Sequence, residues 1–356
     1  MDPPIAESRS ITKVISTKRQ YPQYNYKKMK SFIEKIPKAE LHLHIEGTLE
    51  PELIFKIAKR NKIELKYNSV EKFKKAYNFK DLNSFLYIYY TGMNVLLYEQ
   101  DFYDLTWAYL EKAHEQNILH AEIFFDPQAH TERGISFNTI INGIHHALED
   151  GKSKLGLSSK IIMCFLRHLS EESAMKTLEE SIIHRDKIIA VGLDSSELNN
   201  PPSKFKNVFS KAKSYGYKTV AHAGEEGPPE YIWEAINILN VDRIDHGVRC
   251  LEDEQLVRIL AENQIPLTIC PLSNVKLKVF KDLKELRLHE MLSKGLKVTI
   301  NSDDPPYFGG YIHENLMAVQ ETFNLNQEDI IRLAKNSFES SFLTKEEKNH
   351  YLATVV

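Results

Sequence analysis

Residues 218–226 read Lys-Thr-Val-Ala-His-Ala-Gly-Glu-Glu, and the interpretation of the fold starts from this stretch. Its first four residues are mainly small or β-branched, which is typical of a short buried strand. His222 stands at the C-terminal end of that strand, and Glu225 follows three residues later. In a parallel α/β barrel, side chains at such strand ends face the active-site mouth. A histidine beside a glutamate there can set a metal ligand next to a proton carrier.

Similar strands recur along the chain and alternate with segments of helical periodicity. Eight strands with helical crossovers match a (β/α)8 TIM barrel, so we predict an α/β protein of that fold. A doubly wound open sheet is the alternative, but it needs no eighth strand, and the chain shows no Gly-rich dinucleotide turn. The predicted strands cover residues 39–45, 119–125, 160–166, 188–193, 218–221, 243–245, 265–270 and 296–301.

A helical insertion follows the first strand, because residues 61–118 hold more helix than one crossover needs. Such excursions near a site often form lids. The stripe of aromatic residues within it is predicted to belong to the core rather than to a binding surface. Its members are Phe85, Tyr87, Tyr89 and Tyr90.

Composition narrows the class of protein. The chain has 356 residues and a formal net charge of −3, so no basic field points to nucleic acid. It lacks the apolar run that would span a membrane and the apolar region of a secretory signal. Its three cysteines form no CxxC motif, which favours a reducing compartment. We expect a cytoplasmic protein, or one that is also nuclear if the source is eukaryotic.

The domain organisation is predicted to be simple. Residues 1–28 are polar and aperiodic, which indicates a mobile N-terminal extension. A short helix is predicted from Met29 to Ile36, and Pro37 ends it. Residues 29–356 are predicted to form a single barrel domain. The sequence leaves the oligomeric state open and is compatible with a homodimer.

Ligand-type residues collect at the ends of several predicted strands. His42 and His44 share one face of the first strand because side chains alternate along a strand. Independent core histidines need not all fall at strand C-termini, so the joint pattern predicts a metal site. Imidazoles and carboxylates suit Zn²⁺ and related ions. The residues expected at this mouth are His42, His44, His222, Glu225, His246, Asp303 and Asp304.

A metal at this mouth would explain the neighbouring residues. Bound Zn²⁺ lowers the pKa of water from about 15.7 to about 7, which provides hydroxide at neutral pH. Glu225 can then supply a proton to the substrate. His246 can hold or deprotonate the water, or act as a further ligand. Asp304 lies beside Asp303 and can form a hydrogen bond with the substrate.

At these residues the chain resembles the adenosine/adenine deaminase family of zinc-dependent barrel hydrolases. The resemblance covers about residues 37–340, and the set of motifs in this order is highly specific. The matching motifs are His-Leu-His-Ile-Glu-Gly (42–47), His-Ala-Gly-Glu (222–225), Asp-His-Gly (245–247) and Ser-Asp-Asp-Pro (302–305).

The resemblance implies roles for individual residues. One Zn²⁺ per chain would be bound by His42, His44, His222 and Asp303. Glu225 would protonate N1 of a purine, His246 would orient or deprotonate the water, and Asp304 would contact N7. The implied reaction is hydrolytic deamination, in which water attacks C6, ammonia leaves and a 6-oxopurine forms.

Longer stretches around residues 192–197, 223–232, 270–277 and 303–311 resemble the adenine deaminase branch. Nucleoside-specific members usually have Asp where this chain has Glu46, and Gly where it has Glu197. We hypothesise that Glu46 or Glu197 fills the ribose space and accepts the N9–H that only a free base carries. The expected function is deamination of adenine to hypoxanthine and ammonia in purine salvage.

Other functions remain as alternatives at this stage. Adenosine deaminase and a deaminase of N6-substituted adenines use the same chemistry. A TatD-like metal nuclease also begins with His-x-His on a barrel, but it needs a second metal carboxylate, for which Glu122 is the candidate. A non-catalytic binding protein is disfavoured because no catalytic position is lost.

Overall fold

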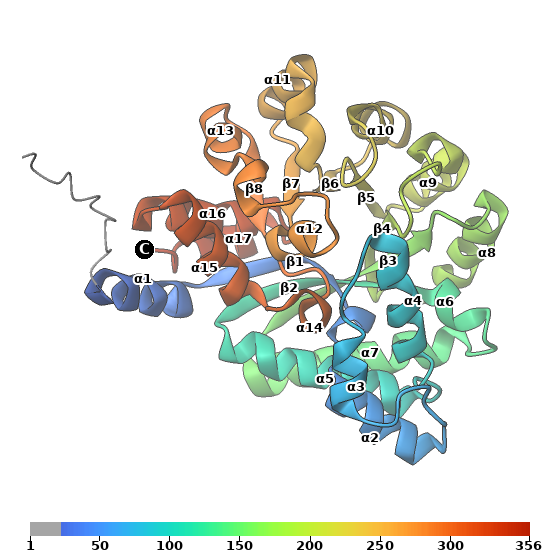
Figure 1. Cartoon of the computed structure of the whole chain (residues 1–356). Coiled ribbons are helices and arrows are strands. Elements are labelled where there is room, and N and C mark those ends of the chain that lie inside the picture. The colour runs from blue at the N-terminus through green and yellow to red at the C-terminus, as the bar shows by residue number, and fades with distance from the viewer. Residues whose placement is uncertain (1–22) are drawn as a thin grey trace, which may run out of the picture.

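The computed structural model describes residues 23–356 and has eight parallel strands at the centre of the molecule, surrounded by helices (Figure 1). The strands are hydrogen-bonded in sequence order from β1 to β8, and every adjacent pair is parallel. The strands are β1 (Lys38–His44), β2 (Ile118–Phe125), β3 (Ser158–Leu166), β4 (Ile188–Asp194), β5 (Lys218–Ala223), β6 (Arg243–His246), β7 (Pro266–Ile269) and β8 (Lys297–Ile300).

The first and last strands meet through the residues that follow β8. The backbone N–H of Asp303 donates to the carbonyl of His42 at 3.1 Å, and the N–H of His44 donates to the carbonyl of Asp303 at 3.1 Å. Leu43 and Asp303 form the parallel bridge between these segments. The sheet therefore returns on itself, and the predicted (β/α)8 barrel is confirmed.

Each observed strand end lies within two residues of the predicted one. The agreement follows from burial, because strands enclosed on both faces need apolar runs that stand out from their polar connections. β5 is representative: its residues from Thr219 onward are buried, and Lys218 alone is exposed.

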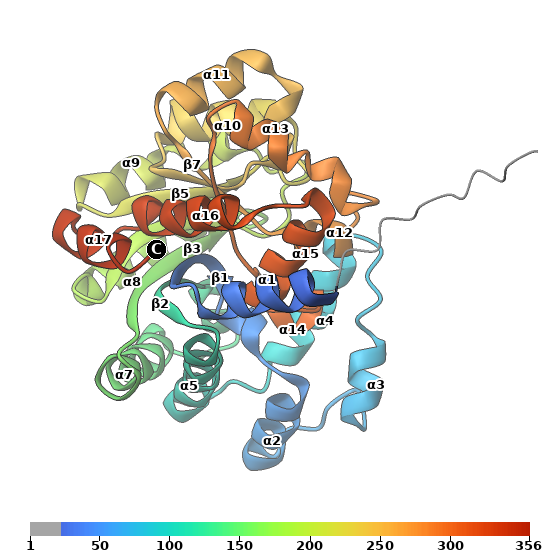
Figure 2. The same cartoon turned by 90° about the vertical axis from the view of Figure 1, so that its left-hand side faces the viewer.

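Helices cover the outside of the barrel, and α16 packs against both β1 and β8 across the closing seam (Figures 1 and 2). The helices are α1 (Gln23–Lys35), α2 (Pro51–Asn61), α3 (Val70–Lys75), α4 (Leu82–Met93), α5 (Glu99–Glu115), α6 (Pro127–Thr131), α7 (Phe137–Leu155), α8 (Glu171–Ser181), α9 (Lys206–Ser214), α10 (Pro229–Glu234), α11 (Glu254–Glu262), α12 (Pro271–Lys276), α13 (Leu288–Ser293), α14 (Pro305–Phe308), α15 (Ile312–Phe323), α16 (Gln327–Ser340) and α17 (Lys345–Leu352).

The predicted start of the first helix needs correction. Helix α1 begins at Gln23, before the predicted start at Met29, so residues 23–28 are helical rather than part of an extension. The rest of the predicted mobile segment, residues 1–22, lies outside the described residues. At the C-terminal end, α16 and α17 are separate helices, because Ser341 adopts an extended backbone and Thr344 caps the start of α17.

The predicted insertion, residues 61–118, holds helices α3, α4 and α5. Helix α5 packs against α7 and β2 as an ordinary outer helix of the barrel. Helix α4 begins with a capping box between Asp81 and Ser84 and crosses the barrel mouth, where several of its side chains line a pocket. The insertion therefore contributes directly to the site.

Charged groups are also buried inside the barrel, below the mouth. Nη1 of Arg243 donates to Oε2 of Glu122 at 2.6 Å, and both side chains are fully buried. The Arg243 guanidinium lies 4.7 Å from the ring centroid of Phe342. Glu122 therefore neutralises Arg243, so the carboxylate that a TatD-like site would need is occupied by a structural ion pair.

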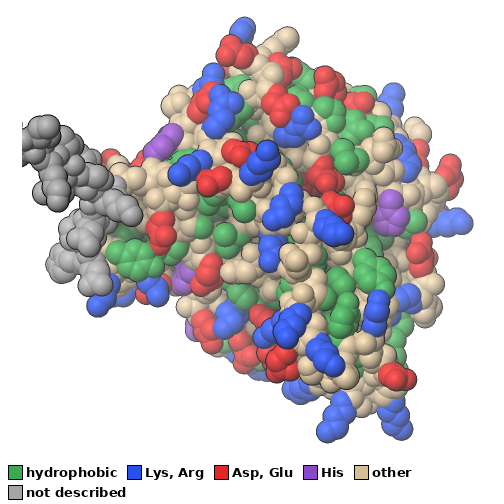
Figure 3. Space-filling view, viewed as in Figure 1, with side chains coloured by type: hydrophobic (Ala, Val, Ile, Leu, Met, Phe, Trp, Pro, Cys, Tyr) green, Lys and Arg blue, Asp and Glu red, His purple; other side chains and the backbone are tan. Residues whose placement is uncertain are grey.

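Acidic and basic side chains are interspersed over the face shown in Figure 3. All three cysteines, Cys164, Cys250 and Cys270, are buried, as expected for small apolar side chains. Among residues 23–356, no helix combines the length and the apolar character needed to cross a bilayer.

Candidate active site

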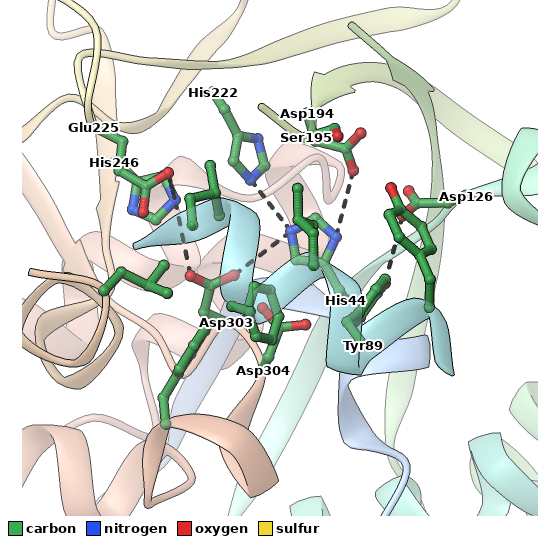
Figure 4. A pocket seen from close by; sticks show the side chains of 16 residues that line it. His44, Tyr89, Asp126, Asp194, Ser195, His222, Glu225, His246, Asp303 and Asp304 are labelled. Atoms are coloured by element: carbon green, nitrogen blue, oxygen red, sulfur yellow. Dashed lines mark hydrogen bonds and ion pairs between the residues drawn. The ribbon is translucent and has the colours of Figure 1, made fainter. Parts of the chain in front are cut away.

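A pocket lies where the C-terminal ends of the strands meet helix α4 (Figure 4). Its polar wall comes from β1, β2, β4, β5, β6 and β8 or the residues just after them, and its apolar wall comes largely from α4. The polar lining residues are His44, Tyr89, Tyr90, Asp126, Asp194, Ser195, His222, Glu225, His246, Asp303 and Asp304.

Nitrogen and oxygen atoms from three strands converge at the base of this pocket. Nε2 of His44 lies 3.2 Å from Nε2 of His222 and 3.5 Å from Oδ1 of Asp303. Nε2 of His42 lies 3.4 Å from the same oxygen. A tetrahedron with metal–ligand bonds of 2.0–2.1 Å has edges of about 3.3 Å, so these spacings fit a zinc-like ion.

His246 belongs to the same cluster but lies further out. Its ligand atoms and those of His42, His222 and Asp303 all lie within 4.8 Å of one another. However, Nε2 of His246 is 3.8 Å from Oδ2 of Asp303, the carboxylate oxygen that His44 does not contact. The distances therefore favour His44 over His246 as the closer partner of the Asp303 carboxylate.

The backbone is strained at two of these positions. His246 has φ 62° and Asp303 has φ 64°, in the left-handed region that non-glycine residues seldom adopt. Ser195, on the pocket wall after β4, has φ 72°. Strained residues of this kind collect at functional sites, where the surrounding structure holds them in place.

Polar residues below the cluster fix the ring orientations. Oγ1 of Thr268 lies 2.9 Å from Nδ1 of His42 and donates to Oδ1 of Asp245 at 2.9 Å. Oδ2 of Asp245 is 3.6 Å from Nδ1 of His222. Each imidazole therefore contacts a polar group through Nδ1 and presents Nε2 toward the cluster, as metal-binding histidines usually do.

Burial keeps most of these imidazoles neutral, which is the form that binds a metal. Burial and, next, the neighbouring His42 lower the pKa of His222 well below its usual value, and they lower that of His246 to about 3. Burial also lowers the pKa of His44 to about 3. For His42, burial acts the same way, but Asp303 outweighs it and raises the pKa.

Glu225 is buried on the pocket wall, and Oε2 lies 3.6 Å from Nε2 of His246. Burial and then the charge of Asp303 raise the pKa of Glu225 well above its usual value. Asn274 contacts both residues: its Nδ2 is 3.5 Å from Oε1 of Glu225 and 3.3 Å from Nδ1 of His246. Sequence reasoning missed Asn274, although it lies within a stretch that carried the resemblance.

Asp304 and Asp126 share one local geometry. Each follows a strand and precedes a proline that starts a helix, with φ −120° and ψ 74° for Asp304 and φ −111° and ψ 80° for Asp126. Proline disfavours a helical backbone in the preceding residue, so both aspartates stay outside the helix, which begins at the proline. Gly47 makes room for Asp304, because a Cβ there would overlap its Oδ1.

The carboxylate of Glu197 faces the protein backbone. Its Oε1 accepts a hydrogen bond from the N–H of Gly224 at 2.7 Å. Its Oε2 accepts from the N–H groups of Glu225, Glu226 and Gly227 at 3.1, 2.8 and 2.7 Å. The prediction that Glu197 binds substrate does not match this arrangement, because both oxygens hold the turn that carries Glu225.

Glu46 also lies off the pocket wall. Its Oε1 accepts from the backbone N–H of Asp126 at 3.1 Å and lies 3.0 Å from Nε2 of His130. Burial raises the pKa of Glu46 to about 7. Glu46 thus supports Asp126, which lines the pocket, while its Oε2 has no hydrogen-bond partner within residues 23–356, so contact between Glu46 and the substrate stays a prediction.

The aromatic stripe of α4 belongs to the core in part, as predicted, because Phe85 and Tyr89 are buried in the core cluster, and it also lines the pocket. Phe85, Tyr89 and Tyr90 are lining residues, whereas Tyr87 is 56% exposed. The helix turns one apolar face toward the site, and the sequence pattern of such a face resembles that of a core-facing helix.

Two residues after β3 support the site from outside. Arg167 is fully buried and donates through Nη1 to the carbonyl oxygen of His222 at 2.7 Å. Nδ1 of His168 lies 2.8 Å from Oγ of the pocket residue Ser195. Arg167 thus holds the end of β5 from one side, while Glu197 holds the following turn from the other.

Comparisons with known proteins agree with this arrangement. A family model described as adenosine deaminase matches residues 37–356. An adenine deaminase from Crocosphaera subtropica is 61% identical over 320 residues, which are 90% of this chain and 98% of the relative. An adenine deaminase from Acinetobacter baylyi is 58% identical over 323 residues, covering 91% and 97% of the two chains.

Among solved structures, adenine deaminase from Arthrobacter aurescens superposes with a TM-score of 0.88. The two chains are 48% identical, and the match covers 90% of this chain and 98% of the other. These matches span nearly the whole length of the relatives, so they include the barrel, the insertion and the polar cluster together.

Proposed function

The chain belongs to the adenosine deaminase family, and we propose that it catalyses the hydrolytic deamination of adenine to hypoxanthine and ammonia. The observation that carries the proposal is a buried glutamate, Glu225, whose carboxyl stays protonated beside a cluster of metal-type donors. The relatives at 61% and 58% identity are named for this activity. Purine salvage is the cellular role that such a reaction would serve.

We propose that one Zn²⁺ per chain is held by His42, His44, His222 and Asp303. Three histidine nitrogens and a carboxylate oxygen form a donor set that zinc accepts, and the distances from His44 to His222 and from His42 and His44 to Asp303, 3.2–3.5 Å, suit its bond lengths. A buried His/Asp cluster of this kind is expensive to leave unpaired, which supports an ion as its partner. When bound, the ion would activate a water molecule for attack at neutral pH.

Glu225 would act first, as a general acid. Its raised pKa keeps a proton on the carboxyl at neutral pH, and this proton can be delivered to the ring nitrogen N1. Protonated N1 withdraws electrons from C6 and prepares that carbon for attack by water. The backbone N–H bonds to Glu197 fix the turn, so the carboxyl keeps its direction toward the pocket.

His246 would orient the attacking water. The Asn274 amide donates toward Nδ1, so the neutral imidazole carries its proton on Nε2, which faces the cluster. A donor in this position can hold the water oxygen and fix its lone pair toward C6. The strained backbone of His246 sets the ring on the pocket side.

Asp304 would hold the five-membered ring of the base. Its side chain lines the pocket, and Oδ1 has no protein partner within residues 23–356. Burial and then the charge of Asp303 raise its pKa well above the usual value, so the carboxyl can donate a hydrogen bond to N7. With N1 and N7 both engaged, C6 is directed toward the His/Asp cluster.

The test uses the full chain after zinc loading, with adenine and adenosine supplied separately. Ultraviolet difference spectra report conversion to a 6-oxopurine, and ammonia release is measured in the same samples. Turnover of adenine with one ammonia per base supports the proposal. Turnover of adenosine alone would overturn the free-base assignment, and inactivity toward both would overturn the function.

A further inference from the structure

Asp126 has an unusual position among the acidic residues of the pocket. It is 3% exposed and lines the wall between the end of β2 and helix α6. Within residues 23–356, its Oδ1 has no hydrogen-bond partner. Its Oδ2 has one long contact, with the hydroxyl of Tyr89 at 3.4 Å. A buried acceptor without a donor costs free energy, so a bound ligand that supplies the donor would be favoured.

The backbone of Asp126 is fixed from behind. Glu46 accepts its N–H, and the same Glu46 oxygen lies beside Nε2 of His130. Arg133 in turn lies 2.7 Å from Nδ1 of His130. Pro127 fixes the start of the following helix. The carboxyl therefore projects from a rigid support, as a specificity-determining group should.

Asp126 and Glu225 stand on opposite sides of the pocket, with His44 between them (Figure 4). They follow β2 and β5, which are three strands apart in the barrel. In adenine, the N3/N9 edge lies opposite C6. A base whose C6 faces the His/Asp cluster and whose N1 meets Glu225 would turn its N3/N9 edge away from the cluster, toward the Asp126 side.

We propose that Asp126 accepts the hydrogen bond from N9–H of adenine and thereby selects the free base over N9-substituted purines. The inference rests on the proposed function and names the residue that sets its substrate range. Asp126 is preferred over Glu197, whose two oxygens accept backbone N–H groups, and over Glu46, which does not line the pocket and supports Asp126 from behind. A glycosylated purine has no proton at N9, so it would leave the Asp126 oxygen unpaired.

The shape of the pocket acts in the same direction. Leu86, Tyr89 and Tyr90 of α4 line the pocket together with Asp126, and the Tyr89 hydroxyl lies 3.4 Å from Oδ2 of Asp126. A sugar on N9 would point into this wall. Asp126 thus contributes a hydrogen-bond requirement, and α4 contributes a limit on size.

The test compares Asp126→Leu and Asp126→Asn with the wild-type full chain, all zinc-loaded. Leucine removes the acceptor at similar volume, whereas asparagine keeps one acceptor oxygen without the charge. Burial and then the charge of Glu46 raise the pKa of Asp126 to about 7, so the acceptor oxygen rather than a full charge is the feature tested. Loss of this acceptor is expected to lower kcat/KM for adenine by about 10- to 100-fold in Asp126→Leu, and less in Asp126→Asn. Asp150→Asn, on the outer helix α7, is the control and is expected to match the wild type.

A second purine separates recognition from general damage. In 9-deazaadenine a carbon replaces N9 and the ring proton moves to N7, which faces Asp304 in wild type and variant alike, so the inhibition constant of this compound is expected to change less than about 3-fold between wild type and Asp126→Leu. Equal losses for both purines, equal losses in the Leu and Asn variants, or unchanged adenine kinetics would each overturn the assignment. The kinetics of the wild type separate failure of the Asp126 assignment from failure of the proposed function. A wild type that is inactive on adenine refutes the proposed function itself.

Discussion

Replacement of Glu197 by glutamine is expected to slow catalysis through the turn that carries Glu225. The carboxylate accepts four backbone N–H groups at 2.7–3.1 Å, three of them on Oε2. The single oxygen of glutamine can keep those three, but its NH₂ group then faces the N–H of Gly224. Gly224 has φ 69° and starts the turn, so the loss falls where the backbone is already constrained.

The magnitude follows from these contacts. One hydrogen bond to a charged acceptor contributes about 1.5–3 kcal/mol, and the three that remain weaken when the acceptor becomes neutral. We therefore expect the free energy of unfolding to fall by about 2–4 kcal/mol. With an unfolding entropy of about 2.1 cal/mol/K per residue, that corresponds to a decrease in Tm of about 3–6 °C. A displacement of about 1 Å in Glu225 would lower kcat about 100-fold.

The assay combines thermal unfolding, zinc content and steady-state kinetics on adenine. Glu171→Gln is the matched control, because Glu171 also accepts backbone N–H groups, those of Asn207 and Val208, but far from the pocket. We expect Glu197→Gln to retain zinc and KM while kcat falls. A normal kcat, or a gain of adenosine turnover at normal kcat for adenine, would refute the reasoning and return Glu197 to the substrate.

Three further outcomes are expected. Glu225→Gln should lower kcat by about 10²- to 10⁴-fold at unchanged metal content, since it removes the acidic proton, and metal loss would contradict this. Dialysis against a chelator should abolish turnover, and one equivalent of Zn²⁺ should restore it; activity that survives metal removal would exclude the proposed centre. Burial disfavours the Glu122 charge, but Arg243 outweighs burial and lowers the pKa of Glu122 to about 2, against an ordinary 4.5. Ionised Glu122 should therefore contribute about 3 kcal/mol to the free energy of unfolding above pH 4.5, and this contribution should be lost as the pH falls toward 2. The difference in the free energy of unfolding between wild type and Glu122→Gln should therefore narrow on acidification.

The positions of the strands were predictable because burial leaves a direct trace in the sequence. The alternation His-Leu-His set His42 and His44 on one face, and the rule that strand ends meet at one mouth joined them to His222, His246 and Asp303. The same rule applied to Asp126 and Asp194, which also follow strands, but their acidity alone did not distinguish a pocket wall from a helix cap.

Side-chain direction beyond the strands was less accessible. A glutamate three residues beyond a strand can face a ligand or a row of backbone amides, and Glu197 faces the amides. The aromatic face of α4 would be shielded from water both in a pocket wall and in the hydrophobic core. The periodicity of its apolar residues is the same in both cases, so the sequence could not distinguish them. Both outcomes depend on contacts between segments distant in sequence, which local pattern does not record.

The seam between β1 and the end of β8 links the site to folding. Asp303 exchanges backbone hydrogen bonds with His42 and His44, and the same three residues supply side chains to the cluster. An ion bound there would link the first strand to the residues after the last strand. Its binding free energy would therefore stabilise the closed barrel. Asp303 follows the last strand, so without the metal the seam between β1 and β8 should open locally before the rest of the barrel. Amide hydrogen exchange at this seam should therefore slow more on metal binding than exchange elsewhere.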